Sequence, residues 1–466
     1  MLPKLAQLAR DQVPRHTARS FTCTLKPSPV RLRGALEASG MPARGCASAW
    51  LRRILQMLSG SLDRAVCGRI LCAGREESRV TGRKVSQRWS AACAPIALTL
   101  ISILAALLLG ELLLRAIFSP GDYLYASLID DPVLGVRIEP YTSGHDALGF
   151  RNRAVPTRVG VVALGDSQTY GWGVPREESW PHQLAALLHE PVYNMALGGF
   201  GPLEELYLAE HEATRFHPRL LLVGLYFGND IADAYHAAHY RTYWYGWRET
   251  TPAAPTQPDD PTSDAREPAK HFAAVRDWLA RNSVLSGFLR VRVFHWLAIL
   301  EKDRLAAQVN PDSQMVWVDP ADHSVRTIFM AQRWLLRLDT GNPDIHEGLR
   351  ITKRAFEALK AHADGLGMRL LVVLIPTKER VYCPYLAQCG DPIPPALARL
   401  CDAEDRVKED VVDFFESKGI VYVDVTQALS DAARRHALIY PQDSDNHPVA
   451  AGYAVIAGAV FDALQR

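Results

Sequence analysis

The chain has 466 residues, 48% of them hydrophobic and 22% charged, and is long enough for one large core with attached segments. Its net charge of +1 combines a basic head with an acidic body, since residues 1–90 hold 17 Lys/Arg and 5 Asp/Glu while the rest hold 35 and 46. The acidic body argues against a nucleic-acid partner. A basic head before an apolar segment indicates a membrane.

That apolar segment runs from Ala91 to Gly110 and continues in three leucines after Glu111. About 20 apolar residues are needed to cross a bilayer core, so a transmembrane helix is expected over residues 91–115, with Glu111 near the outer interface. The positive-inside rule places the N-terminus in the cytoplasm, because the segment is preceded by Arg83, Lys84 and Arg88. The alternatives are a buried core helix and a cleaved signal sequence, although the run is long for the latter.

Residues 1–90 show no sustained helical or strand period and are interpreted as a basic, poorly ordered extension. A true translation start near Met57 or later is the alternative. The body contains three cysteines. If it lies outside the cytoplasm, Cys383 and Cys389 can close a small loop, which leaves Cys401 unpaired. None of these spacings is a metal-binding signature.

Five short apolar runs read as buried strands, over residues 160–164, 191–197, 220–227, 369–376 and 420–425. Helical patterns separate them, which predicts parallel βαβ units. The expected fold over residues 159–466 is a three-layer α/β/α sandwich with a five-stranded, mostly parallel, flavodoxin-like sheet. A juxtamembrane connector over 116–158 precedes it. Residues 231–342 break the rhythm and predict an insertion of helices and loops, either a lid or substrate-binding wall or a structural decoration.

Polar residues and glycines follow the ends of these strands. The first strand ends in Gly165-Asp166-Ser167, two later ones lead to Gly199 and Asn229, and Asp445 and His447 follow the last. Parallel strands place their carboxyl ends at one edge of the sheet, where open α/β folds bind ligands. Taken singly, each has an ordinary structural interpretation as a turn, a loop or a helix start.

Together these residues are the components of acyl transfer. A serine hydroxyl needs a base in contact with it, and the imidazole of His447 can serve. A nearby carboxylate then orients the imidazole. The backbone N–H groups of Ser167 and Gly199 and the amide of Asn229 can hold an oxyanion.

This chemistry requires neither a metal nor a cofactor. Two histidine pairs, His211/His217 and His236/His239, lack a convincing set of further ligands. The segment from Gly199 to Gly201 lacks the third glycine of a dinucleotide-binding fingerprint. Thr169 stands where a nucleophile elbow has its second glycine, which disfavours an α/β-hydrolase.

The strand-end segments resemble the blocks of the SGNH hydrolase superfamily, also called the GDSL esterase/lipase family. They are residues 165–167, 194–201, 228–230 and 445–448. The resemblance implies a serine nucleophile at Ser167, a base at His447 and an oxyanion hole of Ser167, Gly199 and Asn229. Segments 131–135 and 148–151 also resemble membrane-anchored bacterial members.

The position of the acid departs from the family pattern. The family usually places it three residues before the histidine, where this chain has Ser444. Asp445 is therefore the expected acid and Asp443 the alternative. If neither carboxylate orients His447, a Ser-His dyad remains.

The expected protein is a serine esterase or acyltransferase of the bacterial inner membrane, with a periplasmic or extracellular catalytic domain. By resemblance and location, the favoured substrate is an O-acetyl-type, carbohydrate-linked ester. A non-catalytic glycan-binding scaffold of the same fold and a lipid esterase are the alternatives. A second irregular loop is expected over residues 376–398. In it Lys378 is either a contact for an anionic or sugar substrate or a solvated lysine.

Overall fold

The computed structural model describes residues 83–249, 270–290, 316–318, 327–389 and 393–466. Most of the expected N-terminal extension and parts of the expected insertion lie outside these ranges. The chain divides into a unit of residues 1–91 and a unit of residues 92–466. The second unit contains the predicted α/β fold.

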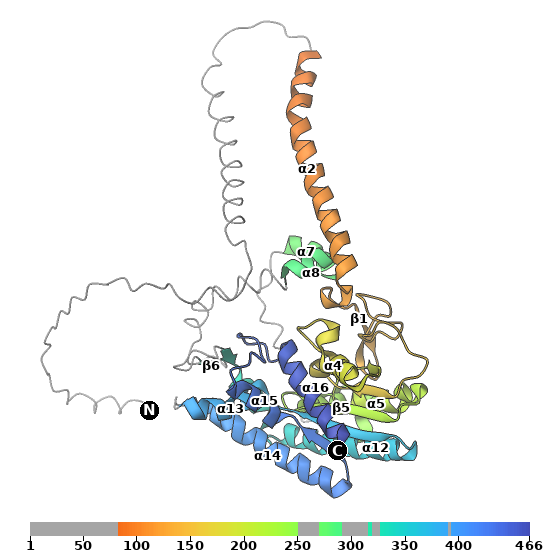
Figure 1. The fold of residues 1–466 in the computed structure, drawn as a ribbon, viewed down its shortest axis with the longest axis vertical. Coiled ribbons are helices and arrows are strands. Elements are labelled where there is room, and N and C mark those ends of the chain that lie inside the picture. The colour runs from red at the N-terminus through yellow and green to blue at the C-terminus, as the bar shows by residue number, and fades with distance from the viewer. Residues whose placement is uncertain (1–82, 250–269, 291–315, 319–326, 390–392) are drawn as a thin grey trace, which may run out of the picture. The chain divides into compact units, whose positions relative to one another are not determined.

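A parallel five-stranded sheet forms the centre of this unit (Figure 1). Its strands are β3 (Val161–Leu164), β4 (Val192–Asn194), β5 (Leu220–Tyr226), β8 (Arg369–Ile375) and β9 (Val421–Asp424). They lie in the order β4-β3-β5-β8-β9, and every neighbouring pair is parallel. The predicted flavodoxin-like sheet is confirmed. β3, β4 and β5 are buried along their whole length, as expected of strands covered on both faces.

The main helices are α4 (Trp180–Leu188), α5 (Pro202–His211), α6 (Asp230–Tyr240), α12 (Pro343–Gly365), α14 (Pro395–Lys418) and α16 (Ala450–Gln465). The crossover through α4 runs from β3 to β4, opposite in direction to the later crossovers. Right-handed crossovers therefore put α4 on one face of the sheet and α5, α12 and α14 on the other. α16 packs against α4 and so shares its face.

The sheet has its topological switch point between β3 and β5, because the chain leaves β3 in one direction and returns past it to β5. Ligands of open α/β sheets bind outside the carboxyl ends of the strands at such a point. Ser167 follows β3 and Asn229 follows β5. The topology therefore brings two predicted site residues to this crevice.

Smaller elements surround the sheet. They are α3 (Ser167–Tyr170), α7 (Lys270–Asn282), α8 (Val284–Phe288), α11 (Ala331–Leu338), α13 (Lys378–Cys389), α15 (Thr426–Arg434), the antiparallel pairs β1 (Leu128–Asp131) with β2 (Gly135–Ile138) and β6 (Val316–Val318) with β7 (Thr327–Phe329), and the 3-10 turns η1 (Pro120–Asp122), η2 (Arg176–Glu178), η3 (Ala213–Phe216) and η4 (Thr242–Trp247). The prediction of an irregular loop over 376–398 is wrong for most of that range, because residues 378–389 form α13 and α14 begins at Pro395.

α6 belongs to the regular helical layer although its residues fall in the expected insertion. Its alanines pack against α5 and α12 in one buried cluster with Leu203, Ile351 and Ala355. Small side chains allow these three helices to approach closely, so α6 is part of the crossover from β5 to β8.

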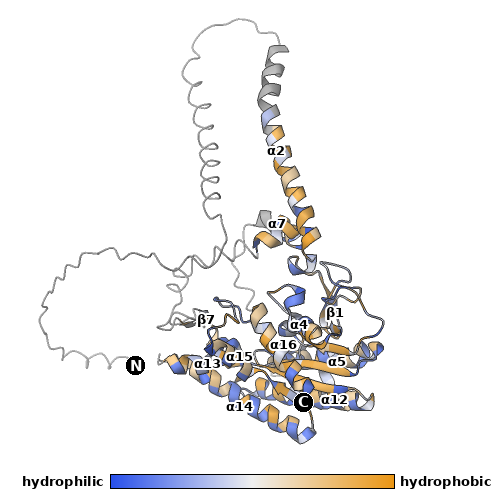
Figure 2. Ribbon diagram, viewed as in Figure 1, coloured by the Kyte–Doolittle hydropathy of each residue, from blue (hydrophilic) through white to orange (hydrophobic). Residues whose placement is uncertain are grey.

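The N-terminal helix α2 spans Arg83–Ile117. Its segment Ala97–Ile117 is long and apolar enough to cross a membrane, and none of the apolar stretch is buried. Figure 2 shows mainly apolar colouring along this segment, whereas α12 and α14 mix polar and apolar residues throughout. The lack of burial along the apolar stretch of α2 excludes the buried core helix considered from the sequence. Its length and composition suit an anchor or a signal sequence.

Glu111 on α2 caps the N-terminus of α8. Its carboxylate accepts hydrogen bonds from the backbone N–H groups of Val284 and Leu285, each at 2.9 Å, and from the Ser283 hydroxyl. Arg115 forms an ion pair with Glu111 and donates to the carbonyl of Asn282. The N-terminus of a helix favours a carboxylate, and here the N-terminus of α8 binds the carboxylate of Glu111. The charge of this acid in the apolar helix α2 is therefore stabilised by protein contacts.

Candidate active site

Ser167 stands at the corner where β3 turns into α3. The Asp166 carboxylate accepts a hydrogen bond from the N–H of Gln168 at 2.8 Å and so caps this single helical turn. Gly165 has φ of +150°, and a Cβ there would lie 2.2 Å from Thr169 Oγ1. Only glycine fits this tight corner, which presents the serine hydroxyl beyond the end of the sheet.

His447 connects Ser167 to Asp445. Its Nε2 lies 2.8 Å from Ser167 Oγ, and its Nδ1 lies 2.7 Å from Asp445 Oδ1. The same Asp445 oxygen accepts the backbone N–H of His447 at 3.0 Å. The imidazole is therefore held on both sides, in the geometry that general-base activation of a serine requires.

The electrostatics favour an ionised Asp445. Burial raises the pKa of its carboxyl group, but the hydrogen bonds and the charge of His447, together with the charge of Lys378, bring that pKa below its usual value. Asp443 has a different position. Its carboxylate accepts the backbone N–H of Asp445 at 2.9 Å and so shapes the turn that carries the acid.

Two of the three expected oxyanion donors are the backbone N–H groups of Ser167 and Gly199, whose segments lie next to each other. Ser167 is the first residue of α3, where backbone N–H groups have no intrahelical acceptor. A Cβ added to Gly198 would lie 3.5 Å from Ser167 Cβ, so the glycine loop passes alongside the nucleophile. Gly199 adopts φ of +84° within this loop.

The third expected donor has a partner that the sequence did not reveal. Asn229 Nδ2 donates to Asp233 Oδ2 at 2.5 Å. An amide nitrogen carries two hydrogens, so one donor remains after this bond. The Asp233 bond therefore orients the amide group without using all of its donor capacity.

A group of buried carboxyl groups lies behind the serine corner. Asp166, Glu205 and Asp230 are almost completely inaccessible. Burial raises the pKa of each, to about 6 for Asp166, and their mutual proximity raises those of Glu205 and Asp230 further. The neutral forms of Glu205 and Asp230 are therefore favoured. This group could not be recognised from the sequence, because acids at or near a helix N-terminus usually face solvent.

An exposed aromatic ring flanks the imidazole. The rings of Trp172 and His447 have centroids 6.2 Å apart, and Trp172 remains 49% exposed. Trp172 also lines a cavity of about 250 Å³ together with Tyr125, Tyr170 and Arg290. A half-exposed indole beside a catalytic-type histidine is a natural contact surface for a substrate.

Lys378 is not a solvated lysine, and it does not face open solvent as a substrate contact would. It is 1% exposed, and its ammonium group donates to the carbonyls of Asp443 and Asp445 at 2.7 and 2.8 Å. Its third bond goes to Thr327 Oγ1 at 3.1 Å. The sequence placed this lysine correctly at the carboxyl edge of the sheet but could not show that it points into the protein.

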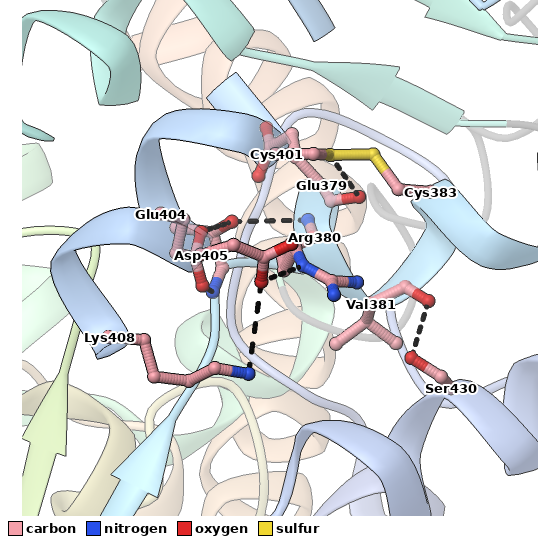
Figure 3. Close-up of a disulfide and its surroundings, with 10 residues drawn as sticks. Glu379, Arg380, Val381, Cys383, Cys401, Glu404, Asp405, Lys408 and Ser430 are labelled. Atoms are coloured by element: carbon pink, nitrogen blue, oxygen red, sulfur yellow. Dashed lines mark hydrogen bonds and ion pairs between the residues drawn. A yellow bond between two sulfur atoms is a disulfide. The ribbon is translucent and has the colours of Figure 1, made fainter. Parts of the chain in front are cut away.

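The cysteine pairing considered from the sequence is wrong. Cys383 on α13 bonds to Cys401 on α14, with their Cα atoms 6.8 Å apart, and Cys389 is free (Figure 3). The same two helices are also joined by an ion pair between Arg380 and Asp405 at 2.7 Å. A link of Cys383 to Cys389 would have joined two residues of one helix, whereas the observed bond joins two helices.

Among the residues that the structure describes, no group of three or more His, Cys, Asp or Glu side chains is arranged to hold a metal ion. Within these ranges, the histidines considered from the sequence mostly pack against aromatic rings instead, as His239 does against Tyr235 at 4.1 Å and His211 against Tyr207 at 4.5 Å.

No family model matches the chain, and no curated protein matches it. Its structural neighbours are GDSL/SGNH lipolytic proteins and esterases at low identity. A lipolytic protein of the G-D-S-L family from Desulfitobacterium hafniense is 12% identical, covering 66% of this chain and 99% of that one, with a TM-score of 0.32. An acetylxylan esterase (a catalytic mutant) from Geobacillus stearothermophilus is 10% identical, covering 66% and 95%, with a TM-score of 0.33. A phospholipase A1 from Streptomyces albidoflavus is 12% identical, covering 66% and 98%, with a TM-score of 0.35.

Proposed function

We propose that the chain is an SGNH-type serine esterase or acyltransferase that uses Ser167, His447 and Asp445. The observation that carries this proposal is the continuous pair of hydrogen bonds through His447, at 2.8 Å to the serine and 2.7 Å to the aspartate. The low pKa of Asp445 supports the same roles, because an ionised carboxylate stabilises the imidazolium that forms.

In the proposed mechanism, Ser167 Oγ attacks the carbonyl carbon of an ester while His447 Nε2 takes its proton. The oxyanion accepts hydrogen bonds from the N–H groups of Ser167 and Gly199 and from the Asn229 amide. Collapse of the tetrahedral intermediate expels the alcohol, which receives the proton from His447. Water or an acceptor alcohol then removes the acyl group from Ser167 by the same steps in reverse.

We propose an O-acyl, carbohydrate-linked ester as the substrate class. The proposal rests on the resemblance of the motif blocks and on the half-exposed Trp172 beside His447, whose flat indole face suits the apolar face of a sugar ring. A lipid esterase is the second candidate, favoured by the apolar part of the cavity next to Trp172. Rates on acetylated oligosaccharides and on esters of increasing acyl length separate the two.

We also propose that α2 anchors the protein in the bacterial inner membrane, with the catalytic domain in the periplasm or outside the cell. The Cys383–Cys401 bond supports this location, since disulfides persist in oxidising compartments. Membrane fractionation followed by N-terminal sequencing of the mature protein tests the anchor. Recovery of a soluble chain that begins after Ile117 would show a cleaved signal instead.

The function itself is tested with a fluorophosphonate probe on the full chain in detergent. Adduct formation on Ser167, absent from Ser167→Ala and strongly slowed in His447→Ala, is the expected result. Absence of any adduct on folded wild-type protein would favour the alternative of a glycan-binding scaffold without catalysis.

A further inference from the structure

Three consecutive residues just beyond β8 and Pro376, namely Thr377, Lys378 and Glu379, are all buried, and each binds a different part of the fold. Their side chains are 0%, 1% and 1% exposed. A strand-to-helix junction at the open edge of a sheet is normally solvated, so three consecutive buried polar side chains require specific partners.

Thr377 and Glu379 tie the segment to two neighbours. The Thr377 N–H and hydroxyl donate to the two oxygens of Glu404 on α14, at 3.0 and 2.5 Å. Glu379 Oε1 accepts the N–H of Met330, which precedes α11, at 2.7 Å. The disulfide between Cys383 and Cys401 then clamps α13 to α14 one turn further along.

Of the three residues, Lys378 is the one that binds the loop carrying Asp445 and His447. It binds the carbonyl of Asp443 and the carbonyl of Asp445, the expected acid itself. Its third acceptor, Thr327 Oγ1 on β7, also bonds to the carbonyl of Asp443 at 3.0 Å. The ammonium group thus joins the β6–β7 hairpin and the Asp445 loop to the rigid end of the sheet.

Lysine suits this place because it carries three donors and no acceptor. The charge is costly to bury, and three oxygen acceptors with the nearby carboxylates of Glu379, Asp443 and Asp445 offset that cost. A neutral side chain of the same length removes the lysine's bonds to both loop carbonyls, and the carbonyl of Asp443 then keeps the hydroxyl of Thr327 and the N–H of Ile328 as donors.

We propose that Lys378 is a positioning residue, which fixes the Asp445–His447 loop at bonding distance from Ser167. This inference rests on the proposed function for its kinetic consequence, whereas the anchoring of the loop can be measured without activity. It also assigns a role to part of the insertion, since Thr327 lies within it and completes the lysine's coordination.

The test uses the full chain in detergent with Lys378→Met, and Lys418→Met as the matched control. Lys418 pairs with Glu357 on the surface, away from the loop, so its replacement is expected to change nothing. Two quantities are measured: the rate and final stoichiometry of fluorophosphonate labelling at Ser167, and hydrogen exchange of peptides covering residues 441–449.

In Lys378→Met we expect labelling to reach one adduct per chain with a rate constant about 10- to 100-fold lower, because small misplacement of a base has effects of this size. Exchange should increase in residues 441–449 and stay unchanged in β3 and α12. With an ester substrate, kcat should fall and KM should change little. An unchanged rate constant, or partial labelling at the wild-type rate, would overturn the proposal, since the latter reports only a loss of folded protein.

Two further outcomes are distinguishable. If the wild type does not react, the proposed function fails, and exchange in residues 441–449 alone decides whether Lys378 anchors the loop. If Lys378→Met does not fold, Thr327→Val carries the test, because it removes one acceptor of the lysine together with the hydroxyl's own bond to the carbonyl of Asp443 and leaves the charge in place. A 2- to 10-fold lower labelling rate with locally faster exchange supports the proposal, and wild-type behaviour of Thr327→Val contradicts it.

Discussion

The imidazole of His447 and the hydroxyl of Ser167 lie 2.8 Å apart although 280 positions separate the two residues in the chain. Ser167 is held by the first strand–helix corner of the sheet, and His447 by a loop just before the last helix, α16. Their meeting depends on the parallel sheet, which places both segments at its carboxyl edge.

The assignment of the acid predicts different effects for two neighbouring aspartates. Asp445→Asn should lower kcat/KM about 10³-fold or more, because an amide neither selects the required tautomer of His447 nor stabilises its charged form. Asp443→Asn should lower it less than 10-fold, since its oxygen can still accept the N–H of Asp445. Steady-state kinetics on both variants make the comparison, and a larger loss in Asp443→Asn would reverse the assignment.

Asn229 and Gly199, two of the expected oxyanion donors, should respond differently to replacement by alanine. Asn229→Ala removes a side-chain donor and should reduce kcat about 10²- to 10³-fold. Gly199→Ala keeps the backbone N–H, and a Cβ there meets nothing within 4 Å. Its φ of +84° should cost about 1–2 kcal/mol of stability and less than 10-fold in kcat. Equal kinetic losses in two equally folded variants would argue against the side chain of Asn229 as a donor.

Trp172→Ala tests the substrate contact. The indole flanks His447 without hydrogen bonding to its ring, so we expect KM to rise about 10-fold for a carbohydrate ester while labelling by a small fluorophosphonate stays near the wild-type rate. Trp172→Phe, which keeps an aromatic face, should restore most of the affinity. A loss of labelling as large as the loss of activity would place Trp172 in the support of His447 instead.

Acid should destabilise the fold through His145. Burial lowers the pKa of this histidine to about 4, against an unfolded value of about 6.5. The depressed pKa keeps the folded imidazole neutral, whereas the unfolded chain takes up a proton below about pH 6.5. The contribution of His145 to the free energy of unfolding is therefore complete above about pH 6.5. About 3 kcal/mol of it is lost as the pH falls toward 4.

Urea unfolding of wild type and His145→Gln at pH 7.5, 6 and 5 measures this contribution. Several buried acids titrate in the opposite sense, among them Glu404 with a pKa raised by burial to about 7. The wild type and the variant share these acids, so the difference between their plots of unfolding free energy against pH reports the histidine alone. Parallel stability curves for the two proteins would contradict the assignment.

The disulfide predicts a specific change in stability. Opening the Cys383–Cys401 bond by Cys401→Ser with Cys383→Ser should lower the free energy of unfolding by about 3 kcal/mol, as expected for a loop of this size. Cys389→Ser, the control, should leave stability unchanged. Peptide mapping without reduction must show a 383–401 crosslink; a 383–389 crosslink would refute this pairing.

The sequence by itself determined the sheet and the order of the motifs along it. Runs such as 220–226 are apolar without interruption, and parallel strands buried on both faces have this local pattern, so position and type could be read directly. The expected site followed because Gly165, Ser167 and Asn229 stand at strand ends, and topology then makes neighbours of residues at one edge.

Only the tertiary structure decided how the polar groups between these motifs are used. Helix α13 contains Pro384 and shows no clear amphipathic period, so its segment looked irregular until its contacts with α14 and α15 were known. The same holds for the partner of Cys383, for the burial of Lys378 and for the bond between Glu111 and α8. Each depends on two segments far apart in the chain, and local periodicity carries no information about which distant segment supplies the partner of a buried polar group.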